Sequence, residues 1–306
     1  MTAAATSAPA TTTRGAGKPS RRRSAVWLGL TPFAIYVILF LAIPAVLAVG
    51  SGFFDSTGTF TFANFSAVTD PSFQADFLNT IVLSAVTAVI GAIVGAVICF
   101  ALLGTKPDGF LRTVIDSASS VLAQFGGVML AFAFIATIGA QGVITQLLVQ
   151  WGLVKNVFNN FEGGTLLYQP WQGLVIPYLY FQIPLMVIVF MPAIAGLKAT
   201  WGEANATLGG TRFTYWTRIA FPILTPAFFG SLILLFANSF SSYATAAALI
   251  SQGGLTSLDI KTALVSETVV GKANQAGILA LAMVVVMIIV MVAYSALERR
   301  ASRWRR

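Results

Sequence analysis

The chain alternates between long apolar runs and short polar segments. A helix of about 20 apolar residues can cross the roughly 30 Å hydrocarbon core of a membrane, and the runs here are too long for the strands of a membrane barrel. The pattern therefore predicts an all-α polytopic membrane protein with six transmembrane helices. The predicted spans are residues 26–51, 78–104, 117–139, 172–196, 223–250 and 275–296.

Two of these spans carry a local signal. Gly91 and Gly95 form a G-x-x-x-G pair in the second span, which predicts close packing against another helix of the chain or of a second chain. The fourth span contains Pro177, Pro184 and Pro192, and we expect kinks there of the kind that membrane helices tolerate.

One polar segment interrupts the apolar pattern between the fourth and fifth spans, with the sequence WGEANATLGGTRFTYWTRIAFPILTP. Thr200 and Glu203 have the spacing of a capping box, which predicts a helix that begins at Trp201. Ala204 and Leu208 follow Trp201 at i+3 and i+7 and share one face of that helix.

Glycines and prolines divide this polar segment. Gly209 and the glycine after it predict the end of the first helix, because glycine adopts a positive φ readily. A second amphipathic helix follows, with Arg212 and Arg218 opposite its apolar face, and Pro222 and Pro226 predict its end and the start of the fifth span. A hinged pair of amphipathic helices between two spans offers a surface to a soluble partner.

The composition supports the membrane assignment and narrows the chemistry. Hydrophobic residues make up 57% of the chain and charged residues 9%, against about 25% charged residues in a soluble domain. There is no histidine, and Cys99 is the one cysteine, which excludes disulfides within the chain, histidine acid–base chemistry and His/Cys metal sites. Because Cys99 lies in an apolar run, we expect it to be a small packing residue.

The basic residues predict the orientation of the chain. If both termini are cytoplasmic, 15 of the 18 Lys and Arg residues lie on the cytoplasmic side and three on the other, as the positive-inside rule requires. The predicted organisation is a disordered tail at 1–25, a transmembrane domain at 26–297 with a cytoplasmic loop at 197–222, and a basic cytoplasmic tail at 298–306.

The polar segment resembles the EAA loop of bacterial ABC importer permeases. The family pattern is E-A-A, three residues, G, nine residues, I, one residue, L-P. The matching positions are Glu203, Ala204, Asn205 where the family has alanine, Gly209, Ile219, Phe221 where the family has leucine, and Pro222. The order of spans around the loop agrees, and Phe77-Leu78-Asn79-Thr80 is similar to the segment that opens the family's core.

The resemblance implies a type I ABC importer permease (MetI-like) fold in a bacterial plasma membrane. It also implies partners: cytoplasmic ABC ATPase subunits, a second homologous permease and an extracytoplasmic substrate-binding protein. The chain has no Walker A motif of its own, since neither Gly17-Lys18 nor Gly271-Lys272 has the upstream glycine. The residues expected to couple the chain to an ATPase are Trp201, Glu203, Ala204, Leu208, Gly209, Ile219 and Pro222.

A translocation path needs polar side chains among the spans, although single Ser and Thr residues more often serve helix packing. The candidates are Gln124, Gln182, Asn238, Ser239, Ser242, Tyr243 and Thr245. The run from Ser242 to Thr245 resembles permeases of the branch that includes polyamine, phosphonate, thiamine, ferric-iron and sulfate transporters, with Ala246 in place of the branch's proline.

These observations predict a non-enzymatic permease subunit, without cofactor or metal, that forms half of the pathway for a small solute such as a polyamine or phosphonate. A sugar-type ABC permease is the alternative. An ion-driven secondary transporter is disfavoured, because it would normally show inverted repeats or intramembrane carboxylates, and neither is evident. The sequence leaves the substrate and the pairing with the second permease open.

Overall fold

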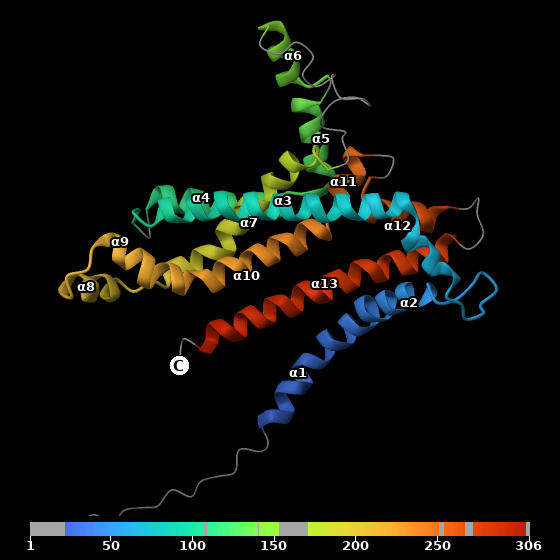
Figure 1. The fold of residues 1–306 in the computed structure, drawn as a ribbon, viewed down its shortest axis with the longest axis horizontal. Coiled ribbons are helices and arrows are strands. Elements are labelled where there is room, and N and C mark those ends of the chain that lie inside the picture. The colour runs from blue at the N-terminus through green and yellow to red at the C-terminus, as the bar shows by residue number, and fades with distance from the viewer. Residues whose placement is uncertain are drawn as a thin grey trace, which may run out of the picture. The chain divides into compact units, whose positions relative to one another are not determined.

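The computed structural model describes residues 22–106, 109–139, 141–152, 171–250, 254–266 and 272–303, with side chains from Leu30 to Ala296 (Figure 1). The predicted terminal tails, 1–25 and 298–306, lie largely outside these residues.

The chain divides into two units, Met1–Leu47 and Ala48–Arg306. Helix α1 (Arg22–Val37) continues through a π-helical turn, Ile38–Ala42, into α2 (Ile43–Ser51), which crosses the boundary between the units. This continuous helix supplies the first candidate span.

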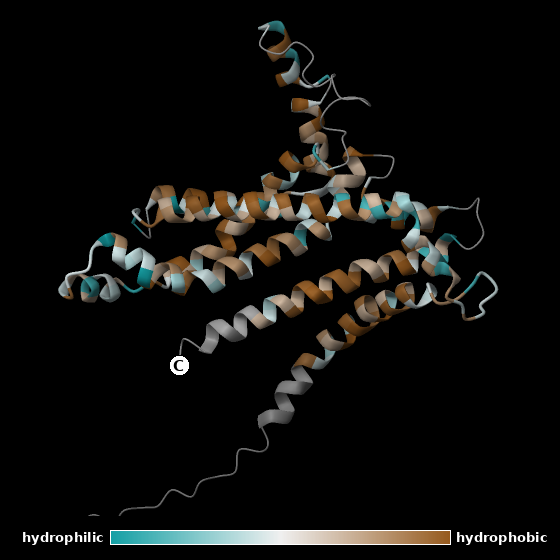
Figure 2. Cartoon of the chain, viewed as in Figure 1, coloured by the Kyte–Doolittle hydropathy of each residue, from teal (hydrophilic) through white to brown (hydrophobic). Residues whose placement is uncertain are grey.

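The described residues contain six helices long and apolar enough to cross a membrane, which confirms the predicted all-α architecture. The candidate spans are Leu30–Ser51, Pro71–Leu102, Gly127–Gln150, Val175–Ala195, Arg212–Phe240 and Lys272–Ala296. Apolar side chains run along these helices, while hydrophilic residues gather at the ends (Figure 2).

The second span, α3 (Pro71–Leu102), follows a short 3-10 helix, Ala63–Thr69. It begins seven residues before the predicted start at residue 78. Asp70 caps α3, accepting a hydrogen bond from the Ser72 N–H at 2.9 Å, and proline suits the first turn because it has no N–H to satisfy there. The sequence pattern predicts a loop over residues 71–77, because the first turns of α3 contain several polar residues.

The prediction of one helix over residues 117–139 is wrong. The structure has three helices here: α4 (Phe110–Gln124), α5 (Gly127–Ile138) and α6 (Val143–Gln150). Gly127 has φ +73° and its N–H donates to Thr245 Oγ1 at 2.9 Å. A hydroxyl from a distant helix therefore satisfies the backbone where the helix breaks.

The prediction for the fifth span, 223–250, is wrong at both ends. The helix runs without interruption through α9 (Arg212–Tyr215), a π-helical turn at Trp216–Ala220 and α10 (Phe221–Phe240). Pro222 lies in the first turn of α10, and the Phe221 N–H bonds to the Trp216 carbonyl in the π-helical turn. The prolines therefore continue the helix instead of ending it.

Three further helices follow that span in the described part of the chain. They are α11 (Ala244–Leu249), α12 (Thr256–Val265) and α13 (Lys272–Arg303). The fifth span therefore ends at Phe240, with Ser241 as the C-cap of α10, and a short turn leads to α11.

In the second unit, α3 packs against α7 (Val175–Ala195) and α10 (Figure 1). Gly91 and Gly95 face α7: a Cβ on Gly91 would lie 3.1 Å from Gln182 Cβ, and a Cβ on Gly95 would lie 2.5 Å from Met186 Cβ. The predicted close packing through these glycines is confirmed, and it occurs within the chain.

The core falls into two clusters along these helices. One joins α3, α7, α5, α11 and α12, and includes Leu83, Leu130, Tyr178 and Leu249. The other joins α3, α7 and α10 and includes Cys99, Met186 and Phe190. Cys99 is fully buried, as a packing residue should be.

Candidate functional site

The polar segment lies at one end of the second unit, where α7 ends and α10 begins (Figure 1). It consists of α8 (Ala199–Thr207), a turn, and the start of the helix that becomes α10. Its hydrophilic residues stand out against the apolar helices in Figure 2. We call Ala199–Ala220 the α8–α9 segment.

The capping box predicted for this segment is wrong. Helix α8 begins at Ala199, two residues earlier than expected, with Lys198 as its N-cap and no side-chain cap hydrogen bond. Thr200 therefore already lies in the first turn, where its hydroxyl no longer has the position of a cap. Glu203 is exposed and its carboxylate is left for another partner.

Hydrogen bonds close the turn between α8 and α9. Gly209 has φ +76°, a left-handed conformation that favours glycine. Asn205 donates from Nδ2 to the Thr211 carbonyl at 3.1 Å, and a Cβ on Gly210 would collide with the Asn205 side chain. Thr211 caps α9 by accepting from the Thr214 N–H at 3.2 Å. Asn205 thus has a structural reason to stand where the family pattern has alanine.

The outer face of the α8–α9 segment exposes apolar side chains. Leu208 is 88% exposed and Phe213 is 77% exposed. Ala204 is exposed beside Glu203, whereas Trp201 is half-buried. The α8–α9 segment therefore leaves two large apolar side chains and a carboxylate exposed, a combination often found where a protein contacts a partner.

An aromatic cluster anchors the segment to the membrane helices. Trp216 packs edge-on against Phe100 of α3 with ring centroids 5.4 Å apart, and tilted against Phe221 at 5.8 Å. Phe190 of α7 contacts Phe100 at 6.3 Å and Phe228 at 5.9 Å. A displacement of the segment would therefore act on α3, α7 and α10 together.

Two other predicted coupling residues lie along the same helix. Ile219 is half-buried within the π-helical turn, and Pro222 is exposed in the first turn of α10. Both residues follow Leu208 and Phe213 in the sequence. They lie in the connection between the α8–α9 turn and the membrane helix. The π-helical turn is a feature that the sequence pattern did not reveal.

Three of the predicted path residues are buried between helices. Gln182 is fully buried and donates from Nε2 to the Leu235 carbonyl at 2.8 Å, while its Oε1 has no hydrogen-bond partner among the described residues. The Ser239 hydroxyl lies 3.0 Å from that of Thr87 on α3. The Thr245 hydroxyl accepts a hydrogen bond from the Gly127 N–H. All three hold helices together in this conformation.

The other predicted path residues reach the surface. Asn238, Tyr243 and Gln124 are exposed and Ser242 is half-buried. The Ser242 carbonyl accepts a hydrogen bond from the Tyr178 hydroxyl at 3.1 Å. The Asn238 amide and the Tyr243 ring are therefore exposed near the end of α10, and the role of these residues in a path remains a prediction.

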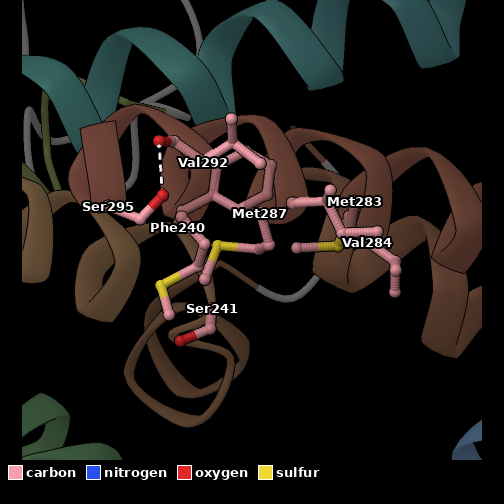
Figure 3. A pocket seen from close by; sticks show the side chains of 9 residues that line it. Phe240, Ser241, Met283, Val284, Met287, Val292 and Ser295 are labelled. Atoms are coloured by element: carbon pink, nitrogen blue, oxygen red, sulfur yellow. Dashed lines mark hydrogen bonds between the residues drawn. The ribbon is translucent and has the colours of Figure 1, made fainter. Parts of the chain in front are cut away.

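A groove of about 470 Å³ lies between the end of α10 and α13 (Figure 3). Its lining residues are Phe240, Ser241, Met283, Val284, Met287, Ile288, Met291, Val292 and Ser295. The Ser295 hydroxyl is bound to the Val292 carbonyl of its own helix at 2.9 Å. The lining is almost wholly apolar, which suits a hydrocarbon surface better than a polar solute.

Sequence comparisons place the chain near transport proteins, although no known family profile matches it. It is 25% identical over 228 residues to the probable starch degradation products transport system permease AmyD of Thermoanaerobacterium thermosulfurigenes, covering 71% of this chain and 73% of that protein. It is 24% identical over 177 residues to the probable sulfate transport system permease cysT of Helicosporidium sp. subsp. Simulium jonesii, covering 57% of this chain and 60% of the relative.

Structural comparisons agree on the fold. A bacterial ABC transporter that imports the acidic polysaccharide alginate contains a chain that matches with TM-score 0.67 and 18% identity, over 92% of this chain and 96% of that chain. The inward-facing MetNI methionine ABC transporter contains one that matches with TM-score 0.54 and 12% identity, over 75% of this chain and 96% of that chain.

Proposed function

We propose that this chain, which is an ABC importer permease subunit by its fold and its sequence relatives, forms half of the translocation path for a small solute. One observation carries the proposal. The α8–α9 segment presents Leu208 and Phe213 on a closed turn, at the family's Glu203–Gly209 spacing, and joins two membrane helices. A surface of this kind can convert movement of a soluble partner into movement of the spans.

The proposed partners follow from this arrangement. The chain would pair with a second permease, dock two cytoplasmic ATPase subunits and receive solute from a binding protein outside a bacterial plasma membrane. An alginate transporter of matching fold has been solved with a periplasmic protein carrying an alginate pentasaccharide, which supports a binding protein here. The chain itself is proposed to be the conduit and not the catalyst.

The coupling step is mechanical in this proposal. Leu208 and Phe213 would enter an apolar cleft of the ATPase, and the Glu203 carboxylate would meet a basic group at its rim. Closure of the ATPase would then displace the α8–α9 segment. The contact of Trp216 with Phe100 would carry that displacement to α3 as well as to α10.

For the solute we propose a saccharide. The exposed groups at the end of α10 are neutral: an amide at Asn238, a hydroxyl at Ser241 and an aromatic ring at Tyr243, with the half-buried Ser242 between the last two. Amides and hydroxyls pair with sugar hydroxyls, and a ring can pack on a sugar face. A polyamine needs carboxylates and a phosphonate needs arginine or lysine, and none of the relatives named above carries a polyamine or phosphonate in its name.

Reconstituted transport tests the function. Proteoliposomes with this chain, its partner permease and the ATPase, supplied with binding protein outside and ATP inside, should accumulate labelled maltooligosaccharide. Spermidine and sulfate serve as competing solutes. Uptake that proceeds without the ATPase and collapses with the proton gradient would overturn the permease proposal, whereas ATP-driven uptake of spermidine alone would overturn only the saccharide.

The coupling surface has its own prediction. Leu208→Asp should weaken ATPase binding about tenfold or more, because a charge would replace an apolar anchor, and ATP-driven uptake should fall with it. Phe110→Asp is the matched control, since Phe110 is 87% exposed at the start of α4 and lies outside the α8–α9 segment. Equal loss in both variants, measured by ATPase titration, would contradict the assignment.

A further inference from the structure

The first turn of α12 is fastened to the start of α3 by buried polar contacts. Thr80 of α3 accepts a hydrogen bond at Oγ1 from the Thr256 N–H at 3.0 Å, and its hydroxyl lies 3.2 Å from that of Thr256. Both threonines are almost fully buried. Asp76 Oδ2 accepts from the Gly254 N–H at 3.0 Å. We call this contact the α3–α12 junction.

A second carboxyl enters the junction from α12. Asp259 lies in the first turn of α12 and its carboxyl meets that of Asp76. Asp259 Oδ2 is buried and has no hydrogen-bond partner among the described residues. Two carboxylates that meet repel each other when both are ionised, and a proton on Asp259 would let its carboxyl donate a hydrogen bond to Asp76.

Among the residues that the structure describes, the surrounding charges do not neutralise this pair. The charged groups around the junction are Asp70 and Asp76 at the start of α3, Lys261 on α12 and Lys272 at the start of α13. Lys272 acts on Asp70, whereas the charges that act on Asp259 are those of Asp76 and Asp70. Lys261 is exposed. A proton is therefore the available counter-charge.

We propose that one proton shared by Asp76 and Asp259 fastens α12 to α3, so that the α3–α12 junction is a latch that loosens when the proton is lost. The latch lies at the opposite end of α3 from the contact between Phe100 and Trp216 (Figure 1). On the proposed function it faces the outside of the cell, where it holds the link between α10 and α13. Its existence does not depend on that function.

The direction of the pH dependence follows from the shift. Burial, and next the negative charge of Asp76, raise the pKa of Asp259 from 3.8 to about 7. At a pH between these two pKa values, closing the latch therefore takes up a proton. The latch is tightest below the lower pKa, weakens as the pH rises through about 7, and changes no further above it.

Hydrogen exchange on the full chain in lipid nanodiscs tests the latch. After correction for the intrinsic exchange rate, protection of the amides in α12 should fall about tenfold per pH unit between pH 5 and 7 and then level off. Asp259→Asn should keep α12 protected at every pH, because an amide can donate to Asp76 permanently. Asp76→Asn should weaken the pH dependence, because it removes the neighbouring negative charge while burial still raises the pKa of Asp259, and it leaves an oxygen for the Gly254 N–H.

Asp55→Asn is the matched control, because Asp55 is an exposed aspartate whose carboxylate bonds to the neighbouring Ser56. It should follow the wild-type profile. The latch is overturned if wild-type protection of α12 does not change between pH 5 and 8, or if both Asp259→Asn and Asp76→Asn retain the wild-type pH dependence. A failure of ATP-driven uptake would leave this exchange result unaffected, so the two proposals can fail separately.

Discussion

Single residues decide how closely the helices approach. Ala88, Gly91, Ala92 and Gly95 form one small-residue face of α3, and all are buried. Without large side chains on this face, the backbone of α3 approaches α7 until Gly95 touches Met186. Because lipid offers apolar contacts as good as those of leucine, close van der Waals packing is a main source of helix association in membranes.

Gly95 should therefore tolerate no side chain. We expect Gly95→Ala to destabilise the protein by about 1–3 kcal/mol through overpacking, because its Cβ would lie 2.5 Å from Met186 Cβ. Gly104→Ala is the control, since nothing lies within 4 Å of a Cβ there. Thermal unfolding in detergent should separate the two variants. Indistinguishable midpoints would mean that the helices can move apart at no cost.

At the scale of the element, the α8–α9 segment is organised by its turn. The chain reverses at Gly209, and the side chain of Asn205 reaches across to the start of α9. The π-helical turn then inserts an extra residue before Pro222. This lets the amphipathic helix and the membrane helix form one continuous rod.

The backbone at Gly209 gives a test that changes no contact. Gly209→Ala should cost about 1–2 kcal/mol, because an L-residue resists positive φ. Nothing lies within 4 Å of its Cβ, so the cost is strain and not collision. We expect ATPase binding to weaken about 5–30-fold. Gly209→Asn should lose much less, since asparagine visits this conformation, and equal losses would point to a direct contact instead.

At the scale of the whole molecule, α3 connects two polar ends. The latch residue Thr80 and the aromatic residue Phe100 are 20 positions apart on this helix, which is about 30 Å and matches the hydrocarbon thickness. The α8–α9 segment and the α3–α12 junction therefore lie on opposite sides of a membrane that α3 crosses.

Cysteine labelling tests which side is which. In a Cys99→Ala background, Ser56→Cys should react with an impermeant maleimide in intact cells, and Thr207→Cys only after permeabilisation, if both termini are cytoplasmic. Both positions are exposed, and Cys99 is buried and so dispensable for labelling. The reverse pattern would invert the orientation that the basic residues predict.

The sequence by itself determined the membrane class, the number of candidate spans and the place of the polar α8–α9 segment. Each of these depends on local quantities: the length of an apolar run, the residue spacing around Glu203 and Gly209, and the distribution of basic residues. Hydrocarbon thickness and backbone hydrogen bonding impose these on any chain. The substrate was not among them.

Only the tertiary structure decided where helices break and which polar groups are free. The break at Gly127 depends on Thr245, which is 118 residues away, and the prolines of the fifth span continue a helix because the π-helical turn redirects the backbone bonds before them. Asp76 and Asp259 look like ordinary loop carboxylates in the sequence. They share a site only because α12 folds back onto α3, and burial there changes how Asp259 holds its proton.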